Sequence, residues 1–170
     1  NGTCVNMGSA CAWTSDAKYG NALSFDGTND GAKVPSSDAF TPTSSGLAIA
    51  AWFKTASYST QTIAIRYGYS SPACGGGAVS TSAYYDLLIY NGQVSVQARD
   101  DTGNPVDDAS SGITYADGRW HHAVAVIDKA NAKLSLYVDG RLANETTLAK
   151  AGAYSFDDAL IVGVTCLSDG

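Results

Sequence analysis

Hydrophobic and polar residues alternate along most of the chain, a pattern typical of half-buried β-strands. Segment 47–55 is the clearest case, with Ile49 and Phe53 on one face and Trp52 on the other. The same period predicts further strands at 22–25, 62–67, 84–90, 93–99, 120–128, 133–138, 141–146 and 159–164. No segment has a convincing helical period, so the pattern predicts an all-β fold.

Turn signals separate these segments at the spacing of hairpins. Asn91-Gly92 lies between two predicted strands and is the strongest short hairpin signal in the chain. Asp139-Gly140 predicts a second tight turn, and 129–132 a third connection between antiparallel strands. About nine or ten strands joined in this way indicate a two-sheet antiparallel sandwich.

Length and charge narrow the class of protein. The chain has 170 residues and a net charge of −6, with only 10 Lys and Arg. We therefore expect one domain and no nucleic-acid binding, which needs clustered cations. No apolar run approaches the ~20 residues that cross a bilayer, so no membrane span is expected. The polar start at Asn1 fits a secreted chain whose leader has been removed, and glycosylation sequons begin at Asn1 and Asn144.

Four cysteines allow three pairings. Cys4 and Cys11 are close enough in sequence to close a local loop, whereas Cys74 and Cys166 lie in distant segments. We favour the pairs Cys4–Cys11 and Cys74–Cys166. A zinc site is the alternative, but the chain has no Cys-x-x-Cys pair to support it. Disulfides in turn favour a secreted, extracellular or cell-surface protein.

Several motifs occur together in one order. They are GNALSFDG from 20 to 27, AAWFK from 50 to 54, DGRWHHAVA from 117 to 125, LYVDGRL from 136 to 142 and IVG from 161 to 163. The ordered set resembles the laminin-G-like domain of the concanavalin A-like lectins and glucanases. The resemblance implies a jelly-roll sandwich at 20–170, preceded by an N-terminal extension at 1–19 that holds the Cys4/Cys11 loop.

The resemblance also implies one further strand. In this family a strand with the pattern Gly-x-Ile-Asp normally follows the Ile-Val-Gly segment, but here the sequence ends at Gly170. Two alternatives follow: the strand lies beyond the end of this sequence, or it comes from elsewhere. A jelly-roll sandwich that lacks this strand has an open sheet edge, which invites pairing with another chain.

A structural calcium ion is the cofactor that the resemblance implies. Asp26, with backbone carbonyl groups near Asn29 or Asp30, would supply some of the six to eight oxygen ligands that calcium takes. The turn around Asp26 is the simpler reading of the same residues. The acidic pairs within 100–108 and at 157–158 are expected to lie in solvent.

The inventory of residues argues against an enzyme. A glycosidase needs two carboxyl groups about 5–10 Å apart, and the chain has a single Glu, Glu145. His121 and His122 are adjacent on a predicted strand, so their side chains point to opposite faces. We therefore predict no catalytic residues.

Aromatic residues are the candidate ligand contacts. Sugars bind to aromatic faces and planar polar groups, and Tyr67, Tyr69, Tyr84 and Tyr85 lie around a glycine-rich segment and the hairpin that follows it. Tyrosine is also simply a common strand residue. Trp52 and Trp120 are expected mainly as structural anchors, with a ligand-stacking role as the alternative.

These observations leave three hypotheses. The first is a non-catalytic extracellular binding or adhesion module for a glycan or a protein. The second is a structural subunit of an extracellular filament or sheath, in which residues 1–19 of one subunit complete the sheet of the next. The third, a glycan hydrolase, is ranked last.

Overall fold

The computed structural model describes residues 2–7, 11–42, 45–67, 84–99, 106–149 and 159–164. Their strands are β1 (Thr3–Val5), β2 (Trp13–Thr14), β3 (Ala22–Leu23), β4 (Gly31–Val34), β5 (Gly46–Lys54), β6 (Gln61–Tyr67), β7 (Tyr84–Tyr90), β8 (Gln93–Arg99), β9 (Asp107–Thr114), β10 (Trp120–Asp128), β11 (Lys133–Val138), β12 (Arg141–Thr147) and β13 (Leu160–Gly163). A short 3₁₀ helix, η1, spans Asp38–Phe40.

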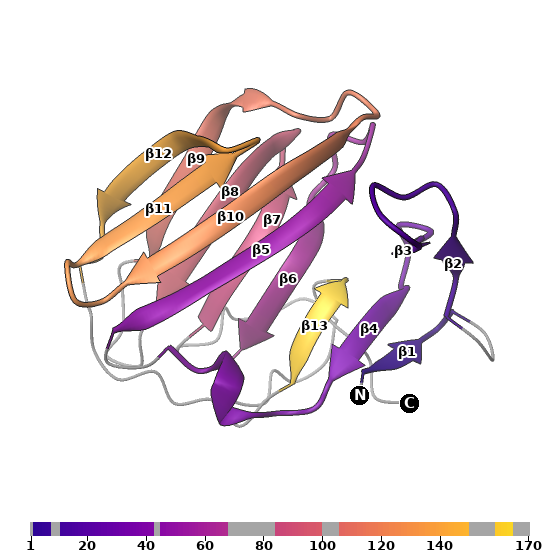
Figure 1. The fold of residues 1–170 in the computed structure, drawn as a ribbon, viewed down its shortest axis with the longest axis horizontal. Coiled ribbons are helices and arrows are strands. Elements are labelled where there is room, and N and C mark those ends of the chain that lie inside the picture. Colours follow the sequence, from indigo (N-terminus) through magenta and orange to yellow (C-terminus); the bar gives the residue numbers. More distant parts are fainter. Residues whose placement is uncertain are drawn as a thin grey trace.

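The strands form two antiparallel layers, as Figure 1 shows. One sheet has seven strands in the order β1-β4-β13-β6-β7-β8-β9. The other has four strands in the order β12-β11-β10-β5, and β2 pairs with β3 in a small third sheet. The predicted two-sheet jelly-roll sandwich is confirmed.

The core lies between the two layers. Leu87, Val94 and Val96 point inward from the seven-stranded sheet, and Ile127 and Leu136 do so from the four-stranded sheet. Each of these side chains is at most 1% exposed. Burial of a Leu, Ile or Val side chain contributes about 1.5–3 kcal/mol, so these alternating positions stabilise the fold.

The predicted turns have the backbone that their residues favour. Asn91 and Gly92 have φ angles of 50° and 77°, and Asp139 and Gly140 have 50° and 77°. These left-handed pairs match the right-handed twist of the flanking strands, which explains the Asn-Gly and Asp-Gly sequences.

Residues near the N-terminus are part of the fold. Strand β1 pairs with β4 at the edge of the seven-stranded sheet, with Thr3 opposite Lys33 and Val5 opposite Gly31. A disulfide joins Cys4 to Cys11 beside this edge, with 5.4 Å between the Cα atoms. Strand β1 therefore forms an edge strand of the seven-stranded sheet of its own chain.

Strand β9 was not predicted, and part of it was expected to be a solvent loop. Asp107 and Asp108 begin the strand and pair with Ala98 and Gln97 of β8. The sequence of β9 is rich in Ser and Asp and has little alternation, so its pairing is decided by β8 and not by its own pattern. Residues 100–105, 157–158 and 165–170 lie outside the described ranges.

Candidate functional site

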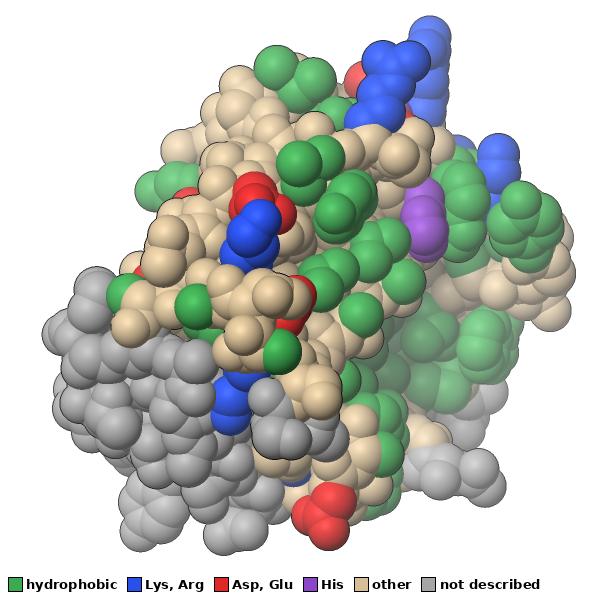
Figure 2. All heavy atoms as spheres, turned by 60° about the vertical axis from the view of Figure 1, so that its left-hand side comes forward, with side chains coloured by type: hydrophobic (Ala, Val, Ile, Leu, Met, Phe, Trp, Pro, Cys, Tyr) green, Lys and Arg blue, Asp and Glu red, His purple; other side chains and the backbone are tan. Residues whose placement is uncertain are grey.

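The outer face of the four-stranded sheet carries a band of hydrophobic side chains. Ala48 and Ala50 of β5 are exposed, and they lie opposite Val126 and Val124 of β10, which are partly exposed. We call these four residues the apolar strip. Figure 2 shows hydrophobic side chains gathered across this face. Alternation predicted the two faces of β5 and β10, but both faces are apolar, so the strip could not be distinguished from the core.

An aromatic cluster lies at one end of the apolar strip. Trp52 is 39% exposed, and its ring centroid is 4.9 Å from that of His122, its cross-strand partner. Tyr19, which is 73% exposed, meets Trp52 edge-on at 5.9 Å. The Lys18 amino group lies 5.0 Å from the Trp52 ring centroid. We call these four residues the aromatic corner.

Asp16 holds the N-terminal loop against this corner. Its carboxylate accepts a hydrogen bond from Lys54 Nζ at 2.5 Å and another from Trp120 Nε1 at 3.3 Å. The hydrogen bonds from Lys54 and Trp120 lower the pKa of Asp16. Trp52 and Trp120 therefore face outward from the four-stranded sheet. Sequence reasoning missed the corner because residues 16–19 are far along the chain from Trp52 and Trp120.

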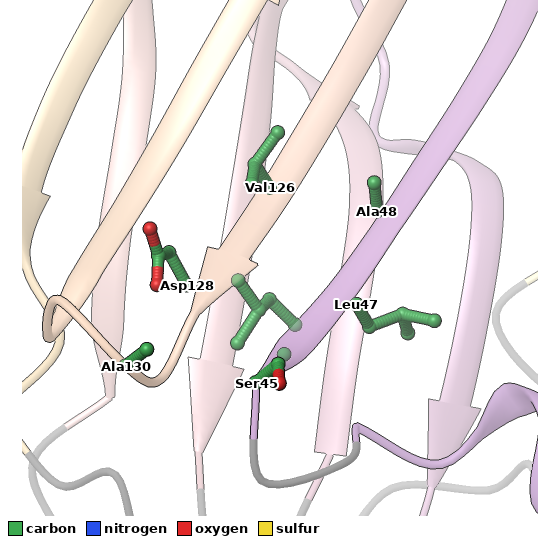
Figure 3. A pocket seen from close by; sticks show the side chains of 8 residues that line it. Ser45, Leu47, Ala48, Val126, Asp128 and Ala130 are labelled. Atoms are coloured by element: carbon green, nitrogen blue, oxygen red, sulfur yellow. The ribbon is translucent and has the colours of Figure 1, made fainter.

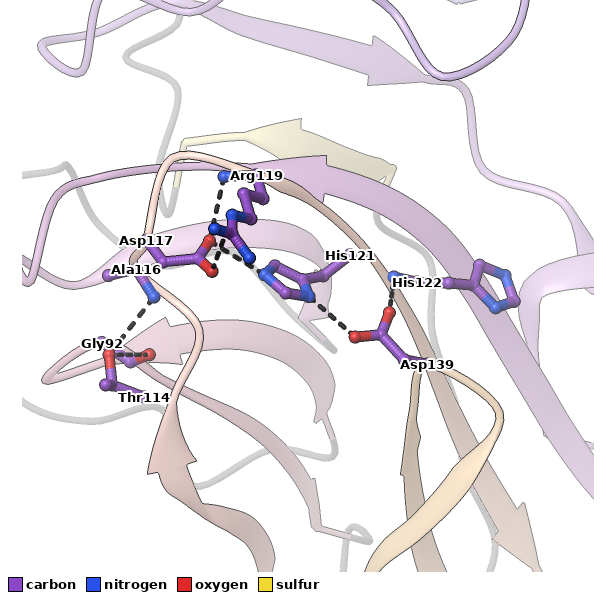
Figure 4. A network of polar contacts seen from close by, with 8 residues as sticks. All are labelled: Gly92, Thr114, Ala116, Asp117, Arg119, His121, His122 and Asp139. Atoms are coloured by element: carbon purple, nitrogen blue, oxygen red, sulfur yellow. Dashed lines mark hydrogen bonds and ion pairs between the residues drawn. The ribbon is translucent and has the colours of Figure 1, made fainter.

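The inner side of β10 carries a polar cluster next to the aromatic corner (Figure 4). His121 Nε2 lies 3.0 Å from Asp117 Oδ1, and His121 Nδ1 lies 2.7 Å from Asp139 Oδ2. Asp139 also accepts a hydrogen bond from the His122 backbone at 2.9 Å. We call Asp117, His121 and Asp139 the His121 cluster. It ties the loop before β10 to the turn after β11.

Charge explains the geometry of the His121 cluster. Both ring nitrogens face carboxylates, so both donate only when the ring is a cation. Burial of His121 opposes its charge, but hydrogen bonds to Asp139 and Asp117 outweigh that effect and raise its pKa. The bond to His121 lowers the pKa of Asp117. Burial opposes ionisation of Asp139, yet its bonds to His122 and His121 lower its pKa. With both nitrogens engaged, His121 is poorly placed to act as a general base.

A shallow hollow lies at the other end of the apolar strip (Figure 3). Its lining includes Ser45, Ala48, Val126, Asp128 and Ala130. The Asp128 carboxylate caps the following turn, accepting bonds from Asn131 N at 3.0 Å and Asn131 Nδ2 at 2.8 Å. The hollow is thus mainly apolar, with polar groups at its rim.

The seven-stranded sheet holds a buried acid. Asp86 is 5% exposed, and its Oδ1 atom has no hydrogen-bond partner among the described residues. Burial raises the pKa of Asp86 to about 7, and nearby Asp108 adds to the shift. Asp108 itself accepts bonds from Ser95 and Gln97 at 2.7 Å and 3.2 Å. A carboxyl this deeply buried is not open to a ligand in this structure.

In the predicted calcium loop, the Asp30 carboxylate lies against the Asp26 backbone. Asp26 N donates to Asp30 Oδ2 at 3.0 Å, and Asp26 Oδ1 accepts from Thr28 N at 2.8 Å. The Asn29 carbonyl accepts from Asn6 Nδ2 at 2.9 Å. Two carboxylates and a carbonyl fit calcium only in part, because the ion takes six to eight oxygen ligands. Across the described ranges, no three His, Cys, Asp or Glu side chains group as a metal site.

The predicted tyrosines have different positions. Tyr85 is 1% exposed and donates to the Phe40 carbonyl at 2.6 Å, so its ring packs in the core and is not available to a ligand. Tyr67 and Tyr84 lie opposite each other at the ends of β6 and β7. Tyr69 lies outside the described residues.

The remaining predicted positions are only partly described. Asn144 is exposed on β12, and its amide donates to the Ser110 carbonyl at 2.9 Å, so its glycosylation stays a prediction. Asn1, Cys74 and Cys166 fall outside the described ranges. In the part of the chain that is described, no helix is long and apolar enough to cross a membrane.

Comparison with known families gives one match over most of the chain. The laminin G model of the concanavalin A-like lectin/glucanase superfamily matches residues 26–166. No curated protein matches the chain in sequence.

Solved structures share the fold at low sequence identity. Domain 4 of AbnA, an extracellular arabinanase from Geobacillus stearothermophilus in complex with arabinotriose, has a TM-score of 0.68 at 20% identity, with 96% of this chain and 73% of that one covered. The receptor-binding domain of botulinum neurotoxin mosaic serotype C/D has a TM-score of 0.65 at 14% identity, with coverage of 95% and 37%. Mouse laminin α1 domains LG4-5 have a TM-score of 0.53 at 17% identity, with coverage of 68% and 27%. The chain thus spans about a third of the toxin domain and a quarter of the laminin fragment.

Proposed function

Because the chain belongs to the concanavalin A-like lectin/glucanase superfamily, we propose that it is a non-catalytic extracellular module that binds a glycan at the aromatic corner. The observation that carries the proposal is the exposure of Trp52 and Tyr19, whose rings contact each other at the edge of the four-stranded sheet. Large aromatic rings are normally buried, so exposed rings held in place by neighbours are typical of a binding surface.

The chemistry of the corner suits a sugar. The apolar face of a sugar ring packs on an aromatic ring, and its hydroxyl groups need polar partners at the edge. The corner offers both, because Trp52 and Tyr19 are bordered by the Lys18 amino group and the His122 ring. The arabinotriose bound to the AbnA domain and the receptor-binding domain of the toxin, which share this fold, support binding as the function.

An extracellular location forms part of the same proposal. The Cys4–Cys11 disulfide supports it, since such bonds persist mainly in oxidising compartments. Catalysis is not part of the proposal, because the two carboxylates of the His121 cluster are both engaged by one imidazolium.

Affinity electrophoresis in gels containing arabinan, xylan, mannan or mixed-linkage β-glucan tests the proposal. We expect retardation in at least one gel, and Trp52→Ala should weaken binding at least about tenfold, equal to ~1.4 kcal/mol. Tyr58→Ala is the matched control, because Tyr58 is 59% exposed but is not part of the corner. Equal mobility of wild type and Trp52→Ala in every gel would remove the proposal, as would release of sugar fragments.

Calcium at the loop of Asp26 and Asp30 is a separate proposal, supported by the contact between the two residues. If the ion binds there, millimolar calcium should raise the Tm relative to EDTA, because a ligand of the folded state stabilises it. Asp26→Asn should remove the shift, whereas Asp38→Asn, in η1, should keep it. The same Tm with calcium and with EDTA would argue against the site.

A further inference from the structure

The aromatic corner and the hollow lie at opposite ends of one continuous surface. Trp52 and Gly46 are six residues apart on β5, which places the two ends about 20 Å apart at ~3.3 Å per residue. The apolar strip fills the distance between them, in register across β5 and β10. The exposed surface is therefore long, with the aromatic corner at one end, and Tyr137 of β11 lies beside its middle, opposite Val124.

Polar and charged side chains border this surface and form hydrogen bonds and ion pairs with one another. On the β11 side, Glu145 accepts bonds from Lys133 Nζ at 2.6 Å and from Ser135 Oγ at 3.0 Å. Lys54 is paired with Asp16 at the corner, and Asp128 caps its own turn at the hollow. The floor of the surface itself carries no charge, so a ligand that covers it loses few hydrogen bonds to water.

Its size favours an extended chain over a folded partner. Two strands about 5 Å apart give the strip an area on the order of 200 Å², and with Tyr137 of β11 and Leu142 of β12 beside it the apolar face reaches on the order of 400 Å². A stable protein interface needs about 800 Å² on each partner. A second copy of the chain would therefore leave most of its contact outside the strip. A linear glycan needs only a narrow track whose floor packs against the apolar faces of successive rings.

We infer that this surface binds the interior of a linear polysaccharide, with one ring on the aromatic corner and the following rings along the apolar strip to the hollow. The inference rests on the proposed function and extends it from a single contact to a chain-length requirement. Short oligosaccharides reach only the corner, whereas long ones gain contact with Ala48, Ala50 and the two valines. Affinity therefore increases with chain length until the hollow is filled.

Calorimetric titration with arabino-, xylo-, manno- and cello-oligosaccharides, from disaccharide to octasaccharide, tests this inference. For the series that binds, we expect affinity to increase at least about tenfold from the disaccharide to the longest members. Ala48→Arg should abolish that gain while leaving the disaccharide affinity unchanged, because Ala48 lies at the end far from Trp52. Ala149→Arg is the control, since Ala149 is exposed beside Asp107 and away from the strip. Thermal unfolding of each variant shows whether it folds.

The outcomes separate this inference from the proposed function. Affinity that is sensitive to Trp52→Ala but independent of length and of Ala48→Arg would overturn the inference and leave the proposed function in place. Absence of binding in every series would overturn both. Sedimentation as a dimer that Ala48→Arg dissociates would identify the strip as a contact between copies and would also overturn the inference.

Discussion

The two sides of strand β10 show opposite ways of using the same residue type. His121 points inward, is held by two carboxylates, and has a side chain only 13% exposed. His122, the next residue, points outward and packs against Trp52 at an exposed edge. On the inner side, the polar side-chain atoms of the His121 cluster bind one another, so the cluster stabilises the fold. On the outer side, the rings remain exposed, so their packing is incomplete until something binds.

The largest expected difference in stability between the inner and outer sides of this sheet concerns two leucines. Leu136 is 0% exposed in the core, whereas Leu142 is 53% exposed on β12. Leu136→Ala should lower the free energy of unfolding by about 2–5 kcal/mol, because it removes buried methyl groups and leaves a cavity. Leu142→Ala should stay within about 0.5 kcal/mol. Urea denaturation measures both, and equal losses would contradict the assignment of the core.

A smaller difference is expected for the two histidines. His121→Ala leaves Asp117 and Asp139 without the cation between them and should cost about 1–3 kcal/mol. His122→Ala should cost less than about 0.5 kcal/mol while weakening glycan binding. Denaturation and affinity electrophoresis of the same two variants provide the comparison. If His122→Ala lowered the free energy of unfolding more than His121→Ala, the His121 cluster would not be a stabilising feature.

The His121 cluster also predicts a dependence of stability on pH. The pKa of His121 is raised in the folded protein. The stabilisation that His121 contributes is therefore complete below the unfolded-state pKa of 6.5 and is lost as the pH rises through the folded-state pKa. The pKa values of Asp117 and Asp139 are lowered in the folded protein. The stabilisation that these two carboxylates contribute is therefore present above the unfolded-state pKa of 3.8 and is lost as the pH falls through their folded-state pKa values. NMR titration of the His121 ring should therefore show protonation persisting above pH 6.5, and an apparent pKa below that value would contradict the cluster.

A second dependence of stability on pH is expected from Asp86, on the other sheet. Its folded pKa of about 7 lies above the reference value of 3.8, so the fold favours the protonated acid. Its contribution is present at low pH and is lost as the pH rises between those two values. Asp86→Asn, which cannot ionise, should remove that part of the stability profile in urea titrations. An unchanged profile would mean that Asp86 is ionised in the folded protein.

Much of the fold could be predicted from the sequence, because nine of its strands carry clear alternation or border Asn-Gly and Asp-Gly turns. Strand β9 could not, since its Ser and Asp residues are ordered by pairing with β8. The short strands β1 and β4 likewise depend on neighbours distant in sequence. The sequence pattern identifies a strand only where the residues of that strand alternate between buried and exposed positions.

The candidate site was harder to predict for a related reason. Trp52 and Trp120 belong to strands whose two faces are both apolar, so hydrophobicity could not say which face meets solvent. The corner also depends on Tyr19 and Asp16, which come from the beginning of the chain and contact Trp52 and Lys54 of β5. Tyr85 shows the converse, since a tyrosine that is a plausible ligand contact in sequence is a core residue in the fold.

The most direct test of the account is an NMR titration of isotope-labelled protein with the polysaccharide fragment that binds best in the gels. We predict that the amide shifts concentrate at Tyr19, Trp52 and His122 and continue along Ala48 and Val126, while His121 and Leu136 move little. Shifts concentrated instead on β7 and β8 of the seven-stranded sheet would contradict the claim that the outer face of the four-stranded sheet is the binding surface.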